Sequence, residues 1–251
     1  MAGVVGLMSG AVQLRQLYKA FDGNQVLQGV DLTIEAGEIL TILGGSGTGK
    51  SVLLKLIIGL LKPDAGGILI EGQDIVPLRE EELLKVRQKV GMLFQGAALF
   101  DSLSVKENVA FPLREHTLMA EAEIGSRVAE VLALVGMTGM EEKFPAELSG
   151  GMRKRVGLAR AVALTPRVVL YDEPTTGLDP RNIDKINELI TALRAKLQVT
   201  SVVVTHDLQS AFRISDRVAL LSGGQIAATG PPGEIAQRDD PVVREFLAGH
   251  L

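Results

Sequence analysis

Eight consecutive residues carry the groups that a protein needs to hold a chain of phosphates. Glycines let the backbone curl so that successive N–H groups point at an anion. Lys50 supplies a positive charge for the outer phosphates, and the hydroxyl of Ser51 suits a Mg²⁺ ligand. The spacing fits the pattern G-x-x-x-x-G-K-[ST] without a gap, over Gly44, Gly45, Ser46, Gly47, Thr48, Gly49, Lys50 and Ser51. This segment, called the phosphate loop below, predicts a nucleotide-phosphate site.

Two carboxylates form the second candidate cluster. Asp172 and Glu173 follow the apolar run from Arg167 to Tyr171, which we expect to be a strand. Ligands of open α/β sheets bind at the carboxyl ends of the strands. In ATPases with such a phosphate loop the first acid holds Mg²⁺, and a neighbouring carboxylate can polarise the attacking water. We therefore assign Asp172 to the metal and Glu173 to the water.

A serine followed by two glycines marks a second candidate anion site. Ser149 suits the N-cap of a helix that we expect over residues 150–164. Gly150 and Gly151 leave the first backbone N–H groups of this helix accessible. Because a helix N-terminus attracts anions, the segment predicts another contact with phosphate.

The elements that must position these groups alternate between strands and helices. The phosphate loop lies between a strand over 38–43 and a helix over 51–61. The strands 168–170 and 202–204 are apolar at consecutive positions, which is typical of a parallel sheet covered on both faces. The strands 12–21 and 30–35, joined by a turn at 22–24, indicate an antiparallel N-terminal subdomain. Further expected elements are strands 68–70, 90–94, 200–205 and 218–221, and helices 79–89, 121–135, 180–197 and 207–214.

This pattern predicts one α/β domain over residues 1–251 with a phosphate-loop core and a mostly parallel sheet. We expect the core to comprise residues 11–95 and 165–240. Residues 96–164 are expected to form an inserted helical lobe, because apolar residues recur there at helical spacing. Residues 241–251 are expected to form a C-terminal arm.

The amino-acid composition excludes several classes of function. The formal net charge is −4 over 251 residues, so no attraction to nucleic acid is expected. The chain has no cysteine, which excludes disulfides and thiolate metal sites. No apolar run approaches the ~20 residues needed to cross a bilayer. Residues 1–10 lack a basic start, and we expect them to be a flexible leader and not a secretion signal.

Further motifs make the chain similar to the nucleotide-binding subunits of ATP-binding cassette (ABC) transporters, and the likeness spans nearly the whole sequence. The segment 148–152 resembles the family signature, although Met152 stands where glutamine is usual. Gln95, after the strand 90–94, resembles the glutamine that touches Mg²⁺ and senses the membrane partner. His206, after the strand 200–205, resembles the switch histidine that contacts the γ-phosphate.

Two other segments add to this resemblance. Residues 176–179, ending in Asp179, are similar to the loop that bridges two subunits, with Thr176 in place of the usual serine. Phe21 sits where the family places an aromatic ring against adenine. Tyr18 is the alternative residue for this stack.

The resemblance implies an enzyme that binds and hydrolyses ATP, with Lys50, Gln95, Glu173 and His206 at the reacting centre. It implies Mg²⁺ held by Ser51, Gln95 and Asp172. It also implies a head-to-tail pair, in which Lys50 of one copy and Ser149 of the other hold the same nucleotide. A transmembrane permease, contacted near Gln95 and through 96–113, would place the subunit on the cytoplasmic face of the inner membrane.

A finer likeness is to the ATPase of Mla-type transporters, which move phospholipid between membranes. Residues 92–95, 98–100 and 112–117 resemble this subgroup, as does Met152. The likeness implies an MCE-domain lipid-binding partner and a small accessory cytoplasmic subunit. The closing stretch 241–251 resembles an arm that reaches the neighbouring subunit.

Three other functions remain open. The first is an ABC importer for a polar amino acid or another small solute. The second is a soluble ABC ATPase that acts on nucleic acid, although such forms usually carry coiled-coil arms or two cassettes. The third is a scaffold that binds ATP without hydrolysing it, and the presence of Glu173 and His206 argues against that.

Overall fold

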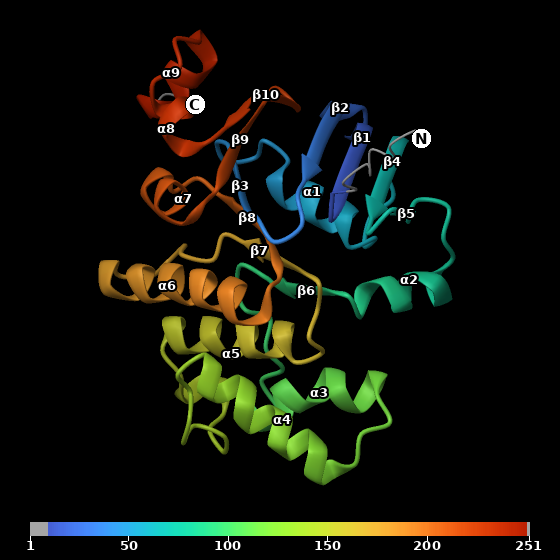
Figure 1. The fold of residues 1–251 in the computed structure, drawn as a ribbon, viewed down its shortest axis with the longest axis vertical. Helices are drawn as coiled ribbons and strands as arrows, with labels where there is room; N and C mark the ends of the chain where they lie inside the picture. Colours follow the sequence, from blue (N-terminus) through green and yellow to red (C-terminus); the bar gives the residue numbers. More distant parts are fainter. Residues whose placement is uncertain (1–9, 250–251) are drawn as a thin grey trace, which may run out of the picture.

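The computed structural model describes residues 10–249, and the proposed leader therefore lies largely outside the described residues. Its core is a sheet with the strand order β10-β9-β3-β8-β7-β6 (Figure 1). The pairs β6–β7, β7–β8, β3–β8 and β3–β9 are parallel, and β9–β10 is antiparallel. The expected α/β fold with a mostly parallel sheet is confirmed. The strands are β3 (Ile39–Leu43), β6 (Val90–Leu93), β7 (Val168–Asp172), β8 (Thr200–Thr205), β9 (Arg217–Ser222) and β10 (Gln225–Gly230).

The central strands are covered on both faces, as their uninterrupted apolar residues predicted. Val202 and Val204 of β8 pack in one hydrophobic cluster with the N-terminal strands and α1 (Lys50–Ile57). Val203, between them, packs in a second cluster with the lobe helices. Since neighbouring side chains of a strand point to opposite faces, one short strand contributes to both cores.

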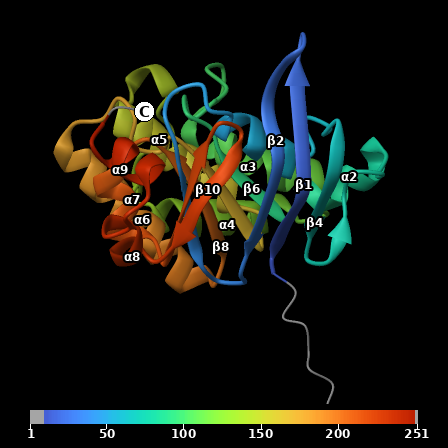
Figure 2. The ribbon, with the colours of Figure 1, turned by 90° about the horizontal axis from the view of Figure 1, so that it is seen from above.

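A second, antiparallel sheet has the order β2-β1-β4-β5 and forms the expected N-terminal subdomain. Its strands are β1 (Val12–Phe21), β2 (Asn24–Ile34), β4 (Ala65–Ile70) and β5 (Gln73–Asp74). Figure 2 shows β1 and β2 beside the hairpin of β9 and β10. The amide of Gln28 donates to Gly224 O at 2.8 Å there, so the subdomain is joined to the edge of the core sheet.

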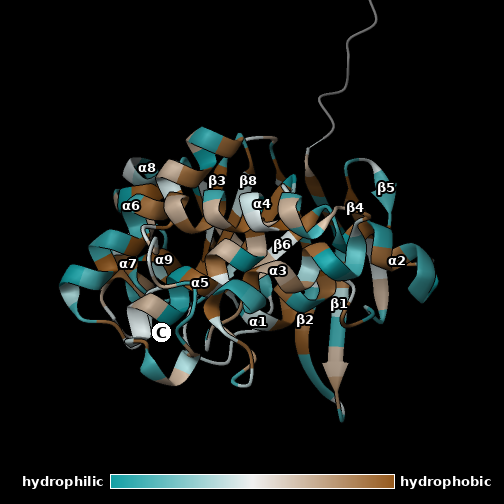
Figure 3. Cartoon of the chain, turned by 90° about the horizontal axis from the view of Figure 1, so that it is seen from below, coloured by the Kyte–Doolittle hydropathy of each residue, from teal (hydrophilic) through white to brown (hydrophobic). Residues whose placement is uncertain are grey.

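Helices cover the core sheet and carry hydrophobic and hydrophilic faces, as the mixed colours of α2 and α6 show in Figure 3. Helices α3, α4 and α5 lie together below α6 in Figure 1. The hydrophobic cluster that these helices share also includes Tyr171 of β7 and Leu93 of β6. The helices are α2 (Glu80–Arg87), α3 (Val105–His116), α4 (Glu121–Leu134), α5 (Gly150–Val162), α6 (Pro180–Leu197), α7 (Leu208–Ile214), α8 (Pro232–Ala236) and α9 (Pro241–Leu247).

Helix α3 is the main element that the sequence pattern missed. Its start carries a capping box, because Ser104 Oγ accepts from the amide of Glu107 and Glu107 Oε2 accepts from the amide of Ser104. The Ser-x-x-Glu spacing was a readable signal. Pro112 inside the helix obscured it, since proline usually ends a helix.

Several other boundaries differ from the sequence pattern. Helix α1 ends at Ile57 and not at residue 61, because Gly59 adopts a φ of 69° that a helix does not continue through. Strand β2 begins at Asn24 and not at residue 30. Strand β10 and helix α8 were not foreseen. Helix α6 and strands β1 and β8 have the expected bounds.

The last described helix packs on its own chain. Val243 and Phe246 of α9 are buried in a small cluster with Leu43, the residue before the phosphate loop. The cluster shows that the C-terminal segment supports the strand end from which the phosphate loop starts.

Candidate active site

The phosphate loop lies between β3 and α1, as its pattern requires. Gly49 precedes the helix with a φ of 99°, a conformation that an L side chain rarely adopts. Lys50 is the first helical residue, and its Nζ donates to Gly44 O at 2.7 Å and Gly45 O at 2.8 Å. Burial lowers the pKa of Lys50, and the nearby carboxylate of Glu173 partly opposes that shift. The first two carbonyl groups of the phosphate loop therefore hold the ammonium group of Lys50.

Asp172 lies at the carboxyl end of β7, directly across from the start of α1. The hydroxyl of Ser51 donates to Asp172 Oδ1 at 2.8 Å. Asp172 is only 6% exposed. The two residues assigned to Mg²⁺ from separate motifs, 121 positions apart, thus already face each other.

Glu173 is the centre of a polar network. Its Oε2 accepts from Thr176 Oγ1 and Thr205 Oγ1, each at 3.1 Å, and lies 3.0 Å from His206 Nδ1. Its Oε1 lies 3.7 Å from Lys50 Nζ. Glu173 is 8% exposed and has a φ of 46°, which is unusual for a residue other than glycine. The carboxylate is therefore held in one direction by groups from three segments, which are the start of α1, the turn after β7 and the end of β8.

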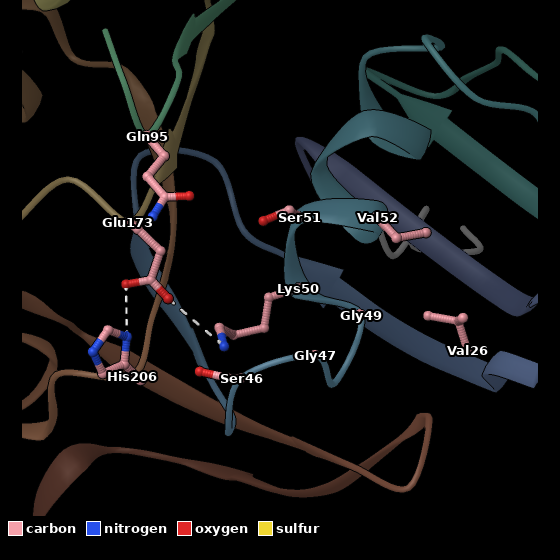
Figure 4. A pocket seen from close by; sticks show the side chains of 10 residues that line it. All are labelled: Val26, Ser46, Gly47, Gly49, Lys50, Ser51, Val52, Gln95, Glu173 and His206. Carbon is pink, nitrogen blue, oxygen red and sulfur yellow. Dashed lines mark ion pairs between the residues drawn. The ribbon is translucent and has the colours of Figure 1, made fainter. Parts of the chain in front are cut away.

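These groups surround one open cavity of about 350 Å³. Gln95 lies on the same side of the cavity as Glu173, and Val26 lies at the opposite end (Figure 4). Lys50 and Glu173 point toward each other across the cavity. The lining residues are Val26, Ser46, Gly47, Gly49, Lys50, Ser51, Val52, Gln95, Glu173 and His206.

The second predicted anion site lies elsewhere on the chain. Ser149 is exposed at the N-terminus of α5, where its Oγ accepts from the amide of Met152 at 3.3 Å. Neither Ser149 nor the glycines Gly150 and Gly151 line the cavity. Asp179 is also outside it and caps α6, accepting from the amide of Asn182 at 3.1 Å. A single chain therefore does not bring these residues to the phosphate loop.

The two aromatic candidates for adenine are both partly exposed and lie outside the cavity lining. Phe21 is 40% exposed at the end of β1, with Lys19 Nζ 5.2 Å from its ring centre. Tyr18 lines a separate polar hollow with Gln28 and Asp31. Tyr18 thus lies in a hollow other than the nucleotide cavity, and both rings stay proposals for the adenine contact.

The donor set fits Mg²⁺. Hydroxyl, carboxylate and amide oxygens from Ser51, Asp172 and Gln95 are the hard ligands that this ion prefers. The short contact between Ser51 and Asp172 shows that two of these oxygens already converge. The ion would be held by these groups beside the phosphate loop.

Sequence reasoning missed several residues around the site. Val26 and Val52 provide its apolar wall, and Thr205 anchors the carboxylate of Glu173. Lys154, on α5, is buried and donates from Nζ to Glu173 O at 2.8 Å. A threonine directly before His206 was a weak signal, and a lysine inside a helix is usually a surface residue, so neither stood out.

Comparison with known proteins places the chain in one family. Residues 27–176 match the family model described as ABC transporter. The chain is 46% identical over 242 residues to the probable ribonucleotide transport ATP-binding protein Mkl of Mycobacterium tuberculosis, covering 96% of this chain and 67% of that protein. It is 43% identical over 228 residues to the intermembrane phospholipid transport system ATP-binding protein MlaF of Haemophilus influenzae, covering 90% and 86%.

A third relative and a solved structure agree with this assignment. The methionine import ATP-binding protein MetN of Brucella abortus is 41% identical over 237 residues, covering 94% of this chain and 64% of that protein. The dimeric post-hydrolysis structure of the ATP-binding cassette MJ0796, bound to ADP and Pi, aligns with a TM-score of 0.82 at 34% identity, covering 88% of this chain and 98% of that one. The chain belongs to the ABC transporter family as an ATP-binding subunit with ATPase activity.

Proposed function

We propose that this chain is the ATPase of a phospholipid transporter and that two copies act head to tail. The observation that carries the pairing is the separation of Ser149 from the cavity that Lys50 and Glu173 line. Ser149 is exposed at the N-terminus of α5, and Gly150 after it is half-buried. Such a helix N-terminus can bind an anion that another molecule brings. A second copy would supply that anion as the nucleotide held in its own phosphate loop. The related cassette MJ0796 was solved as a dimer bound to ADP and Pi, which supports the formation of a pair.

Several polar residues of the cavity then have a chemical task. Lys50 and the backbone of the phosphate loop hold the triphosphate, while Ser51, Asp172 and Gln95 hold Mg²⁺. The bound ion would neutralise charge on the phosphates during transfer. Glu173 orients the attacking water and accepts its proton, and His206 contacts the γ-phosphate from beside Glu173. Loss of the γ-phosphate removes the group that both copies share.

An apolar groove is the proposed docking surface for the permease. It has a volume of about 400 Å³ and includes Phe94, Phe100 and Phe111. Phe100 and Phe111 are 45% and 39% exposed, with ring centres 4.9 Å apart. Phe94 and Ala98, on either side of Gln95 in the chain, both line the groove, so a helix seated there could displace Gln95 in the nucleotide cavity. Within residues 10–249 the structure contains no helix that could span a membrane. The proposed permease would hold the subunit at the cytoplasmic face of the inner membrane.

Phospholipid is the proposed cargo because the sequence likeness to one subgroup favours it. Segments 92–95, 98–100 and 112–117 resemble Mla-type ATPases, and the match to MlaF covers most of both chains. The proposed partners are thus an MCE-domain protein and a small cytoplasmic subunit. The match to MetN favours a second candidate, an importer of a small polar solute.

The test is purification of the intact complex from detergent-solubilised membranes, followed by identification of the subunits that elute with this chain. An MCE-domain protein and phospholipid in the eluate would support the lipid function. A periplasmic solute-binding protein in their place would overturn it and support the importer. Nucleic acid in the eluate would contradict both.

A further inference from the structure

Lys154 is a buried cation with no role in the proposed binding or hydrolysis of ATP. It lies on α5, the helix that begins after Ser149, and is 5% exposed. Lysine is almost never fully buried unless it is paired. Here its Nζ donates to the main-chain oxygen of Glu173 at 2.8 Å. Helix α5 thus begins at the candidate anion site of Ser149 and, through Lys154, contacts Glu173 beside the nucleotide cavity.

The backbone of Glu173 needs such support. Its φ of 46° is a left-handed conformation, which persists in a non-glycine residue only where the surroundings hold it. The amide of Glu173 donates to Val204 O at 2.9 Å, which fixes one side of the residue. The next residue, Pro174, has no N–H and disfavours helical conformations before it. The Glu173 carbonyl accepts from the Thr176 amide at 3.3 Å and, over a shorter distance, from Lys154 Nζ at 2.8 Å. Lys154 is therefore a side chain that fixes this end of the residue.

We propose that Lys154 is a positioning residue for Glu173. Its ammonium group fixes the Glu173–Pro174 peptide and thereby the direction of the carboxylate that prepares the attacking water. Because α5 begins after Ser149, each Glu173 is held by the helix that faces the nucleotide of the other copy. This second statement rests on the head-to-tail pair of the proposed function, whereas the first does not.

The positive charge matters as well as the hydrogen bond. Glu173 and Asp172 are adjacent buried carboxylates, 8% and 6% exposed. Two negative charges so close repel each other unless cations lie nearby. Lys50 lies near Glu173 on the cavity side, and Lys154 reaches the same residue from α5. Arginine at 154 should therefore retain part of the effect, and an uncharged side chain should not.

The first experiment measures ATP hydrolysis by the intact complex. In Lys154→Met we expect kcat to fall about ten- to a hundred-fold, the scale of losing a charge-assisted hydrogen bond, with KM for ATP unchanged. Lys154→Arg should recover part of kcat. Arg155→Met is the matched control, because its Nη1 contacts Gly136 O at 3.3 Å, away from the reacting loop.

Two outcomes would overturn the proposal. One is a Lys154→Met complex with the kcat of the Arg155→Met control. The other is a loss of thermal stability that accounts for all lost activity, with no recovery in Lys154→Arg. If Lys154→Met does not fold, Lys154→Gln replaces it, since glutamine keeps a donor without the charge and should also lower kcat at constant KM.

A mixed pair separates an effect on Glu173 from an effect on Ser149. One copy carries Glu173→Gln, so only the Glu173 of the other copy works. Lys154→Met in the working copy should lower turnover, whereas in the Glu173→Gln copy it should not. The reverse pattern would show that Lys154 acts through Ser149 on the other copy's nucleotide, and would overturn the proposal.

The pair itself is tested independently. ATP should bring two Glu173→Gln copies together, which sedimentation measures directly. If they stay apart, the head-to-tail pair fails, yet the comparison of Lys154→Met with Arg155→Met still decides whether Lys154 positions Glu173. The two failures are thus distinguishable.

Discussion

Lys50 Nζ lies 3.7 Å from Oε1 of Glu173, although 123 residues separate the two along the chain. Both groups are almost fully buried, at 6% and 8% exposure. In the proposed function, this pair joins the lysine assigned to phosphate to the carboxylate assigned to the attacking water. A triphosphate entering the cavity would compete with Glu173 for Lys50, which frees the carboxylate for its chemical task.

Replacing Glu173 by glutamine should stop hydrolysis and keep binding. We expect turnover to fall by about a hundred-fold or more, the usual scale for loss of a general base. ATP should still bind, because Lys50 and the phosphate loop are intact, and the protein should accumulate as a closed dimer in sedimentation. Glu188→Gln, on the exposed part of α6, is the control. A monomer with normal turnover would contradict the assignment.

Replacing Lys50 by alanine should weaken nucleotide binding itself. A charge-assisted hydrogen bond contributes ~1.5–3 kcal/mol, so we expect at least about a tenfold loss of ATP affinity in calorimetry. Lys55→Ala is the matched control, because Lys55 is exposed on the same helix. Equal affinity of the two variants would refute the role of Lys50.

Placing an arginine at Ser149 should block the pair without harming the cavity. Ser149 is exposed and outside the cavity lining, so a single chain should bind ATP as before. In the Glu173→Gln background, Ser149→Arg should abolish the ATP-dependent dimer in sedimentation. Ser126→Arg, on the exposed side of α4, should leave the dimer intact. Dimers formed equally by both variants would exclude the head-to-tail contact.

A charge in the apolar groove should separate the subunit from its permease. Phe111 is 39% exposed and lines the groove, so Phe111→Glu places a carboxylate among aromatic side chains. We expect loss of co-purification from membranes with unchanged ATP binding. Leu118→Glu is the control, because Leu118 is fully exposed and does not line the groove. Retention of the permease by Phe111→Glu would show that it docks elsewhere.

The stability that the Arg114–Glu121 ion pair contributes between α3 and α4 should depend on pH. Arg114 donates to both carboxylate oxygens of Glu121, at 2.8 and 2.7 Å, and this hydrogen bonding lowers the pKa of Glu121 below its ordinary value of 4.5. A depressed carboxyl pKa contributes stability above pH 4.5 that is lost as the pH falls through the folded-state pKa. A double-mutant cycle with Arg114→Ala and Glu121→Ala should show coupling near pH ~7 and none near pH ~3. Equal coupling at both values would contradict this.

The sequence alone was enough to predict the ABC family and its ATPase activity, because the motifs that indicate them are local. The phosphate loop, the carboxylates after an apolar strand and the capped glycine-rich helix each need only neighbouring residues to be recognised. Consecutive apolar residues in β7 and β8 likewise identified strands that are buried on both faces. Helix α3 escaped because Pro112 masked the signal of its capping box.

Only the tertiary structure decided which of these groups share a cavity. Strands β7 and β8 are neighbours in one parallel sheet, so their carboxyl ends bring Asp172, Glu173 and His206 to the start of α1. Ser149 has an equally clear local signature, yet packing of α5 places it outside that cavity. The contact between Lys154 and Glu173 O was found only in the tertiary structure, because it joins two segments that no local sequence pattern connects.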